Sequence, residues 1–198
     1  MKHHGYAFLV LRLLLIFMVG AWLAPFASTA RSARGTAFDL AGKPVDPLKA
    51  SAGKVVVLVF VRTDCPVSNR YAPTIQQLSA AHEADAAFWL VYPDKAETAE
   101  VIRKHDSEYG YKIPALRDPE KALVKESQAQ ITPEAAVFDV RGHLVYHGRI
   151  DNLYEDIGRA RTMATTHELE DAIEAAASGK TLAVSTVHAV GCYISDLE

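Results

Sequence analysis

The sequence is poor in cysteine and has no run of basic residues. Only two cysteines occur among its 198 residues, Cys65 and Cys192, so any disulfide within this chain has to join these two. The net charge of -3 and the absence of a Lys/Arg cluster argue against a nucleic-acid partner. There is no internal repeat and no low-complexity segment. A hydrophobic content of 49% in a chain of this length is typical of one well-buried domain.

The first 30 residues have the pattern of a signal peptide. Lys2 begins a short basic start, the stretch Leu9–Leu23 is apolar apart from Arg12, and small residues precede a predicted cleavage near Ala30. The alternative is a retained membrane anchor, but the uninterrupted apolar run Leu13–Ala24 is shorter than the ~20 residues that a span needs. We therefore expect an exported, periplasmic or otherwise extracytoplasmic protein, which contacts the membrane only through this segment if it is not cleaved.

The most informative stretch is an apolar run that leads into a cysteine. Residues 55–61 are valine-rich, which predicts a strand covered on both faces. Pro66 suits the first position of a helix, so Cys65 is expected at the helix N-terminus. Free backbone N–H groups and the positive end of the helix dipole favour a thiolate there. Asp64 opposes this effect, and Arg62 is available to offset it.

The rest of the chain alternates predicted strands and helices, which indicates an α/β fold with a mixed central sheet and helices on both faces. The first two core strands are expected to be parallel, and the last two to form an antiparallel hairpin around residues 141–143. We assign residues 31–180 to this domain and residues 181–198 to a C-terminal tail. The strands are predicted at Thr36–Leu40, Val55–Val61, Ala87–Tyr92, Ile113–Leu116, Ala135–Val140 and Leu144–Arg149, and the helices at Pro66–Ala84, Glu97–Tyr109, Pro119–Gln128 and Thr166–Ser178.

Several of these segments resemble a known family. The strand leading to Cys65 and Pro66, and Ile131–Pro133 before a strand and hairpin, look like the thioredoxin fold. Thr63–Pro73, Tyr146–Asn152 and Val190–Cys192 resemble the exported redoxin, or peroxiredoxin-like, proteins of the alkyl hydroperoxide reductase and thiol-specific antioxidant superfamily. The similarity runs from about residue 38 to the C-terminus.

The resemblance implies roles for individual residues. Cys65 matches the nucleophilic thiol, and Pro133 matches the cis-proline beside it, whereas the alternative is a trans proline at a strand edge. In the cis geometry the backbone of Thr132 would hydrogen-bond an extended substrate. The residues expected to bind substrate or support the thiol are Thr63, Pro66, Asn69, Arg70, Thr132, Pro133 and Arg149.

Two departures from the family pattern bear on the chemistry. Ser68 stands where thioredoxin-type reductases have their second cysteine, so no local dithiol forms. Arg62 stands where peroxiredoxins place a Thr or Ser, with Thr63 one step off, which puts the usual activation of peroxide in doubt. Arg149 and Arg117 are the candidates for a positive charge beside the thiolate.

Cys192 has three possible roles. On a mobile tail it could resolve a sulfenic acid or a mixed disulfide formed on Cys65. Alternatively, the two cysteines form a static disulfide, or Cys192 is a thiol packed in the core. Third, His188 and Cys192 with Cys65 would resemble a soft-ligand Cu(I) site, although copper chaperones of this fold have two cysteines close together.

The leading hypothesis is an exported thiol oxidoreductase with Cys65 as its redox nucleophile and Cys192 as the resolving thiol. It would need no cofactor and no metal, and would act on a peroxide or a protein disulfide with an unidentified thiol as electron donor. The resemblance slightly favours peroxide. The alternative is a non-catalytic copper-binding or scaffold module. Residues 149–158 are expected to cover the sheet edge close to the thiol.

Overall fold

The valine-rich run forms the central strand of the sheet, β3 (Val55–Phe60), and all its side chains are buried. It pairs in parallel with β4 (Ala86–Tyr92) and antiparallel with β7 (Glu134–Phe138). β-Branched side chains covered on both faces explain why this run is continuous rather than alternating. The computed structural model describes residues 37–195 except 52 and 181–184, so the predicted signal peptide lies outside the described residues.

The main sheet has eight strands in the order β11-β8-β7-β3-β4-β5-β1-β2. Two further pairs of strands, β9 with β10 and β6 with β12, lie outside it. The remaining strands are β1 (Ala37–Asp39), β2 (Pro44–Val45), β5 (Ala115–Arg117), β6 (Ile131–Thr132), β8 (Leu144–Gly148), β9 (Tyr154–Asp156), β10 (Arg159–Ala160), β11 (Ser185–Val187) and β12 (Cys192–Tyr193).

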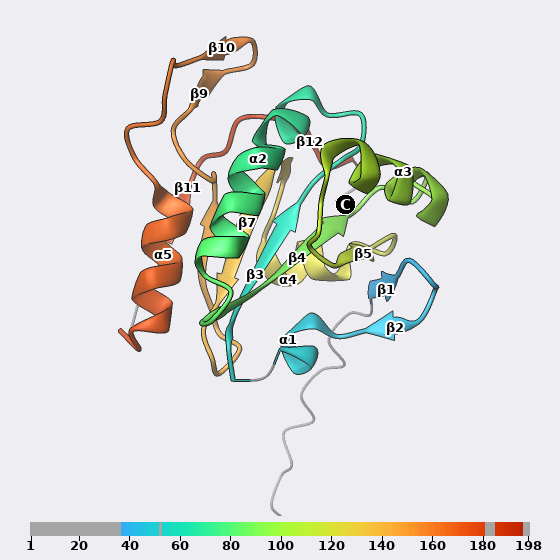
Figure 1. The fold of residues 1–198 in the computed structure, drawn as a ribbon, viewed down its shortest axis with the longest axis horizontal. Helices are drawn as coiled ribbons and strands as arrows, with labels where there is room; N and C mark the ends of the chain where they lie inside the picture. Colours follow the sequence, from blue (N-terminus) through green and yellow to red (C-terminus); the bar gives the residue numbers. More distant parts are fainter. Residues whose placement is uncertain (1–36, 52, 181–184, 196–198) are drawn as a thin grey trace, which may run out of the picture. The chain divides into compact units, whose positions relative to one another are not determined.

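Helices cover both faces of the sheet (Figure 1). Alternate residues of β3 belong to two separate clusters. Val55, Val57 and Val59 pack with α2, α3 and α5, whereas Leu58 and Phe60 pack with α1 and α4. The helices are α1 (Pro47–Ala50), α2 (Pro66–Ala81), α3 (Ala99–Tyr109), α4 (Ala122–Ser127) and α5 (Glu168–Ala177).

The predicted fold class is confirmed. β3 and β4 are parallel, β7 and β8 form the antiparallel hairpin, and β1 with β2 forms the edge of the sheet. Within the described residues, no helix has the length and apolar character needed to cross a membrane.

The predicted start of α4 at Pro119 is wrong by three residues, because Lys121 adopts a left-handed conformation (φ 54°) and the helix begins only at Ala122. Asp118 still serves the helix start, since its carboxylate accepts hydrogen bonds from the N–H groups of Ala122 and Val124. The start of α5 is also shifted: His167, not Thr166, is its N-cap.

Candidate active site

Cys65 lies between the end of β3 and the start of α2, as predicted. Cys65 is the N-cap residue of α2, and Pro66 is the first residue of the helix. Four residues connect Cys65 to the end of β3. The Cys65 side chain is fully buried and makes no capping hydrogen bond of its own. Its sulfur therefore stands at the positive end of a helix of 16 residues.

A cis-proline faces this thiol. The Thr132–Pro133 peptide bond is cis, which confirms the isomer expected at this position. The sulfur of Cys65 lies 3.1 Å from the carbonyl oxygen of Thr132, to which the neutral thiol donates a hydrogen bond. The β6 strand and the start of α2 thus meet at Cys65, although they are far apart in the chain.

Cys192 completes the group. It lies in β12, which pairs antiparallel with β6 so that Cys192 is directly opposite Thr132. The Thr132 hydroxyl donates to the Cys192 carbonyl oxygen at 3.3 Å, so Cys65 and Cys192 both contact Thr132. Both cysteines are free thiols. Cys192 is therefore held by backbone pairing with β6, whereas one of its predicted roles assumed a mobile tail.

Close backbone contacts fix both ends of residues 187–192, which we call the strap. At its start Val187 pairs with Gly148, and at its end Cys192 pairs with Thr132. A Cβ added to Gly148 would lie 2.2 Å from the Val187 carbonyl oxygen, and one added to Gly191 would lie 2.1 Å from the Thr132 carbonyl oxygen. Only glycine permits these two approaches.

The surroundings of the two thiols separate their pKa values. Burial raises the pKa of Cys65, but hydrogen bonds from Cys192 and Ser68 lower it, and the net shift is downward. For Cys192, burial and the hydrogen bond to Cys65 raise the pKa to about 11. Cys65 is thus the more acidic thiol of the pair.

Hydrogen bonds hold the loop that precedes the thiol. The N–H of Thr63 donates to Glu97 Oε1 at 2.7 Å, and the side-chain amide of Asn69 donates to the Thr63 carbonyl oxygen at 3.1 Å. Asn69 Oδ1 lies 2.8 Å from His105 Nε2. Arg62 pairs with Asp64 at 2.9 Å rather than with the sulfur. Thr63 and Asn69 therefore support the thiol through the backbone of its loop.

Two buried polar residues here were missed by sequence reasoning. Glu97 is 7% exposed, and its Oε2 has no hydrogen-bond partner among the described residues. His105 was assigned to one side of a polar helix, but its Nδ1 lies 2.9 Å from the hydroxyl of Tyr92. A periodic pattern places such residues on a helix or near its start, but it does not reveal which of them turn toward a loop from another part of the chain.

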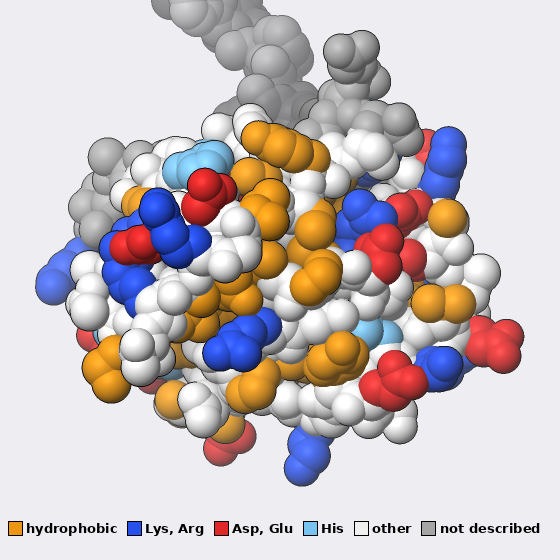
Figure 2. Space-filling view, turned by 90° about the horizontal axis from the view of Figure 1, so that it is seen from above, with side chains coloured by type: hydrophobic (Ala, Val, Ile, Leu, Met, Phe, Trp, Pro, Cys, Tyr) orange, Lys and Arg blue, Asp and Glu red, His pale blue; other side chains and the backbone are white. Residues whose placement is uncertain are grey.

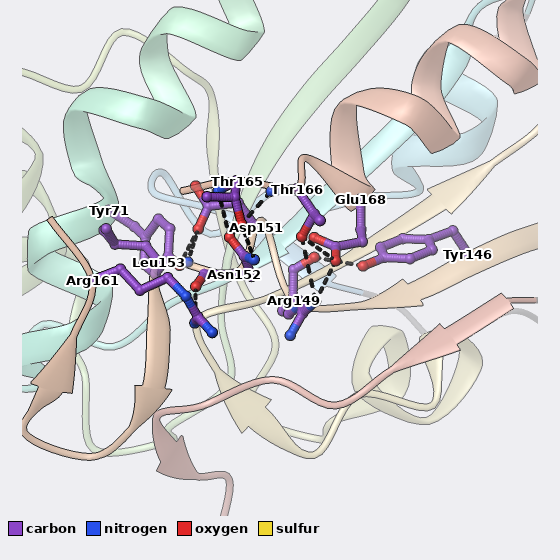
Figure 3. Close-up of polar contacts among 10 residues, drawn as sticks. All are labelled: Tyr71, Tyr146, Arg149, Asp151, Asn152, Leu153, Arg161, Thr165, Thr166 and Glu168. Carbon is purple, nitrogen blue, oxygen red and sulfur yellow. Dashed lines mark hydrogen bonds and ion pairs between the residues drawn. The ribbon is translucent and has the colours of Figure 1, made fainter. Parts of the chain in front are cut away.

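The predicted cationic residues lie apart from the thiols. Arg70 is exposed. Arg149 forms an ion pair with Glu168, as Figure 3 shows, and Arg117 donates through Nε to the carbonyl oxygen of Glu97. Neither Arg149 nor Arg117 is in hydrogen-bond or ion-pair contact with Cys65 or Cys192 in the described part of the chain.

Residues 149–153 follow β8 and are held by a buried polar network (Figure 3). The hydroxyl of Tyr71, in α2, donates to Asp151 Oδ1 at 2.5 Å. Asn152 Oδ1 accepts hydrogen bonds from the N–H groups of Thr165 and Thr166. The segment thus ties α2 to the approach to α5, and its hydrophobic residue Leu153 packs against the core.

A thiol at a helix start, opposite a cis-proline and on a mixed sheet with helices on both faces, defines a thiol oxidoreductase of the thioredoxin fold. The chain belongs to the Redoxin family, whose model matches residues 27–162. No curated protein matches it.

Solved structures with low sequence identity share the fold. A hypothetical protein from Sinorhizobium meliloti is 22% identical, with a TM-score of 0.68 over 80% of this chain and 88% of that chain. An uncharacterized conserved protein from Geobacillus kaustophilus is 21% identical, with a TM-score of 0.69 over 81% of this chain and 87% of that chain. A secreted disulfide oxidoreductase from Mycobacterium tuberculosis is 20% identical, with a TM-score of 0.51 over 74% and 96%.

Proposed function

We propose that this protein is an exported thiol–disulfide oxidoreductase in which Cys65 is the nucleophile and Cys192 the resolving thiol. The observation that carries the proposal is that Thr132, beside the cis-proline, contacts both cysteines: its carbonyl oxygen lies 3.1 Å from the Cys65 sulfur at the start of α2, and it pairs with Cys192 across β6 and β12. In this pair Cys192 takes the role that the second cysteine of a local dithiol would have, since the local position is Ser68.

The reaction balances with these two thiols alone. The Cys65 thiolate attacks one sulfur of a substrate disulfide, which forms a mixed disulfide and releases one substrate thiolate. Cys192 then loses its proton and attacks the Cys65 sulfur, which forms the Cys65–Cys192 disulfide and releases the second substrate thiolate. The substrate gains two electrons and the enzyme dithiol loses them. An external thiol donor has to reduce the enzyme again.

The geometry supports disulfide exchange better than peroxide reduction, which the sequence slightly favoured. Peroxide cleavage needs a donor for the leaving oxygen, and the two predicted arginines are bound to Glu168 and to the Glu97 carbonyl instead. Disulfide exchange needs an acidic thiol and a nearby second thiol, and the lowered pKa of Cys65 and the position of Cys192 support this chemistry. Because Cys65 is fully buried, residues that cover it have to move aside before a substrate sulfur can reach it.

Trapping with a neutral disulfide, 2-hydroxyethyl disulfide, tests the proposal. The reduced wild-type protein should give the Cys65–Cys192 disulfide, whereas Cys192→Ser should stop at a mixed disulfide on Cys65, identified by peptide mass spectrometry. Cys65→Ser should react much more slowly. Equal reaction rates of Cys65→Ser and Cys192→Ser would contradict the assignment of the nucleophile.

Two further measurements address the alternatives. Rapid dimedone labelling of Cys65 after peroxide, together with slow disulfide exchange, would reverse the choice of substrate. Stoichiometric Cu(I) binding that is lost in Cys65→Ser, without disulfide exchange, would favour the copper-binding alternative. Export is proposed from the pattern of residues 1–30, and N-terminal sequencing of the mature protein should find a start close to Arg31.

A further inference from the structure

The backbone edge beside the cis-proline is already occupied by the chain itself. Cys192 pairs with Thr132 and Tyr193 pairs with Ile131, antiparallel. An extended peptide that bound here by strand addition would need the same backbone groups of β6. Unless β12 leaves, this edge cannot bind a protein segment, so a substrate has to approach from another side.

A cleft lies beside the strap. Its volume is about 390 Å³, and the arginines Arg149, Arg159 and Arg161 line it. Three residues of the strap, Val187, His188 and Val190, also line it, and Cys192 follows two residues after the last of these. The size is within the range of small-molecule sites. The strap therefore leads from the cleft to Cys192.

The cleft carries an excess of positive charge. Glu155 is the one acidic residue that lines it, and this carboxylate is shared by Arg159 at 3.0 Å and Arg161 at 2.8 Å. The charge of Arg149 is balanced by Glu168, which does not line the cleft. Two guanidinium groups thus share one carboxylate, and His188 lies beside them.

The guanidinium groups are also held in position. Arg161 donates through Nη1 to the Asn152 carbonyl oxygen at 2.7 Å, and Arg149 is held by Glu168 and Thr166 (Figure 3). Planar, oriented guanidinium groups suit carboxylates, which accept two hydrogen bonds from one arginine. Figure 2 shows the molecule from above, with charged side chains on both sides of a central area that contains hydrophobic side chains.

We propose that the arginine-lined cleft binds the carboxylates of a low-molecular-weight disulfide, whose sulfur atoms then reach the thiol pair at the end of the strap. This inference rests on the proposed function and narrows it from disulfides in general to small anionic ones. The chemistry is the exchange described above: one substrate disulfide is reduced to two thiols, and the Cys65–Cys192 disulfide forms.

The experiment compares three disulfides of similar size and different charge: 3,3'-dithiodipropionate (anionic), 2-hydroxyethyl disulfide (neutral) and cystamine (cationic). Each rate with the reduced protein is divided by its rate with a free dithiol, which removes intrinsic reactivity. The anionic disulfide should react roughly tenfold faster than the neutral one, and cystamine should be slowest. In the double variant Arg159→Gln/Arg161→Gln, the rate with the anionic disulfide should fall to the rate with the neutral disulfide. The rate with the neutral disulfide should stay unchanged.

Two variants control for general charge and for the carboxylate. Arg141→Gln removes an exposed arginine that also pairs with a carboxylate, Asp139, in the turn between β7 and β8, and it should leave all three rates unchanged. Glu155→Gln should raise the rate with the anionic disulfide, because the cleft then loses its one lining carboxylate.

The outcomes separate this inference from the proposed function. Equal normalised rates for the three disulfides in the wild-type protein, or a parallel loss of all three in the double arginine variant, would overturn the anionic cleft while leaving disulfide exchange intact. If none of the three oxidises the thiol pair, the proposed function itself fails.

Discussion

Cys65 and Cys192 both contact Thr132, although most of the domain separates the two cysteines in the chain. The contact of Cys192 depends on β12, which pairs with β6 immediately before the cis-proline. The C-terminal strand β12 therefore supplies the second thiol, which a cysteine in the first turn of α2 would otherwise supply.

The ionisation of Cys65 should depend on its donors. We expect the thiolate absorbance of the reduced protein to appear below the ordinary pKa of a thiol, while Cys192 titrates only near pH 11. Cys192→Ala removes the group that lowers the pKa of Cys65 most, so this variant should raise that pKa. The pKa of Cys65 is lower in the folded than in the unfolded protein, so its thiolate stabilises the fold at a pH above the unfolded pKa. This stabilisation is lost as the pH falls through the folded pKa.

Cys65→Ser provides the baseline for this titration, because it removes the thiolate and retains the tyrosines. An unshifted titration of Cys65 in the wild-type protein, or the same pKa in Cys192→Ala, would contradict the described hydrogen bond.

Gly191→Ala should loosen the strap. The added methyl group would meet the Thr132 carbonyl oxygen at 2.1 Å, a contact that backbone atoms can relieve only by moving apart. We expect alkylation of Cys65 to become faster, since the side chain is now fully buried, and formation of the Cys65–Cys192 disulfide to become slower. Timed alkylation followed by peptide mass spectrometry measures both.

Gly158→Ala is the matched control for the strap. Gly158 lies in the turn between β9 and β10, where no heavy atom lies within 4 Å of an added Cβ but φ is +80°. This variant should lose roughly 1 kcal/mol of stability through backbone strain with the thiols equally accessible. Unchanged alkylation of Cys65 in Gly191→Ala would show that the strap does not cover the thiol.

Tyr71→Phe should destabilise the fold by about 1–2 kcal/mol. The Tyr71 hydroxyl donates to the buried carboxylate of Asp151, which keeps only its bond from the N–H of Leu153 in the variant. Urea unfolding measures the difference. Tyr109→Phe is the control, because Tyr109 is 38% exposed and should lose less than ~0.5 kcal/mol. Equal losses of stability in Tyr71→Phe and Tyr109→Phe would mean that the hydrogen bond to Asp151 contributes little to stability.

The central fold was predictable because its signals are local. The apolar run of β3, Pro66 at the helix start and the turn between β7 and β8 each specify their own structure. The strands of the tail were not predictable, since β11 and β12 are short and are stabilised by partners far away in the chain, Tyr146–Gly148 and Ile131–Thr132.

The same reasoning explains the outcome for the site. The positions of Cys65 and the cis-proline follow from motifs, and the structure brings them together. The location of Arg149 and the burial of Glu97 depend on packing between separate segments, which no short pattern specifies. The cationic side chain expected at the thiol instead pairs with Glu168.

Glu97→Gln should stabilise the protein at neutral pH by roughly 1 kcal/mol. Burial raises the pKa of Glu97, and its Oε2 has no hydrogen-bond partner in the described part of the chain, so the charged form is unfavourable in the fold. Glutamine keeps an oxygen that can accept the hydrogen bond from the Thr63 N–H. The pKa of Glu97 is higher in the folded than in the unfolded protein, so the wild-type side chain contributes most to stability at a pH below the unfolded pKa. This contribution is lost as the pH rises through the folded pKa.

The stability difference between Glu97→Gln and the wild-type protein should therefore shrink as the pH is lowered toward the unfolded pKa of a glutamate. Urea unfolding at neutral and at acidic pH measures it, with Glu100→Gln as the control, because Glu100 is an exposed residue in the first turn of α3. A variant that is less stable than the wild type by the same amount at both pH values would mean that the contacts of the carboxylate outweigh its burial. If Glu97→Gln is instead more stable at neutral pH, the protein retains a buried acid beside its thiol loop at the expense of stability, which is typical of groups kept for chemistry rather than for folding.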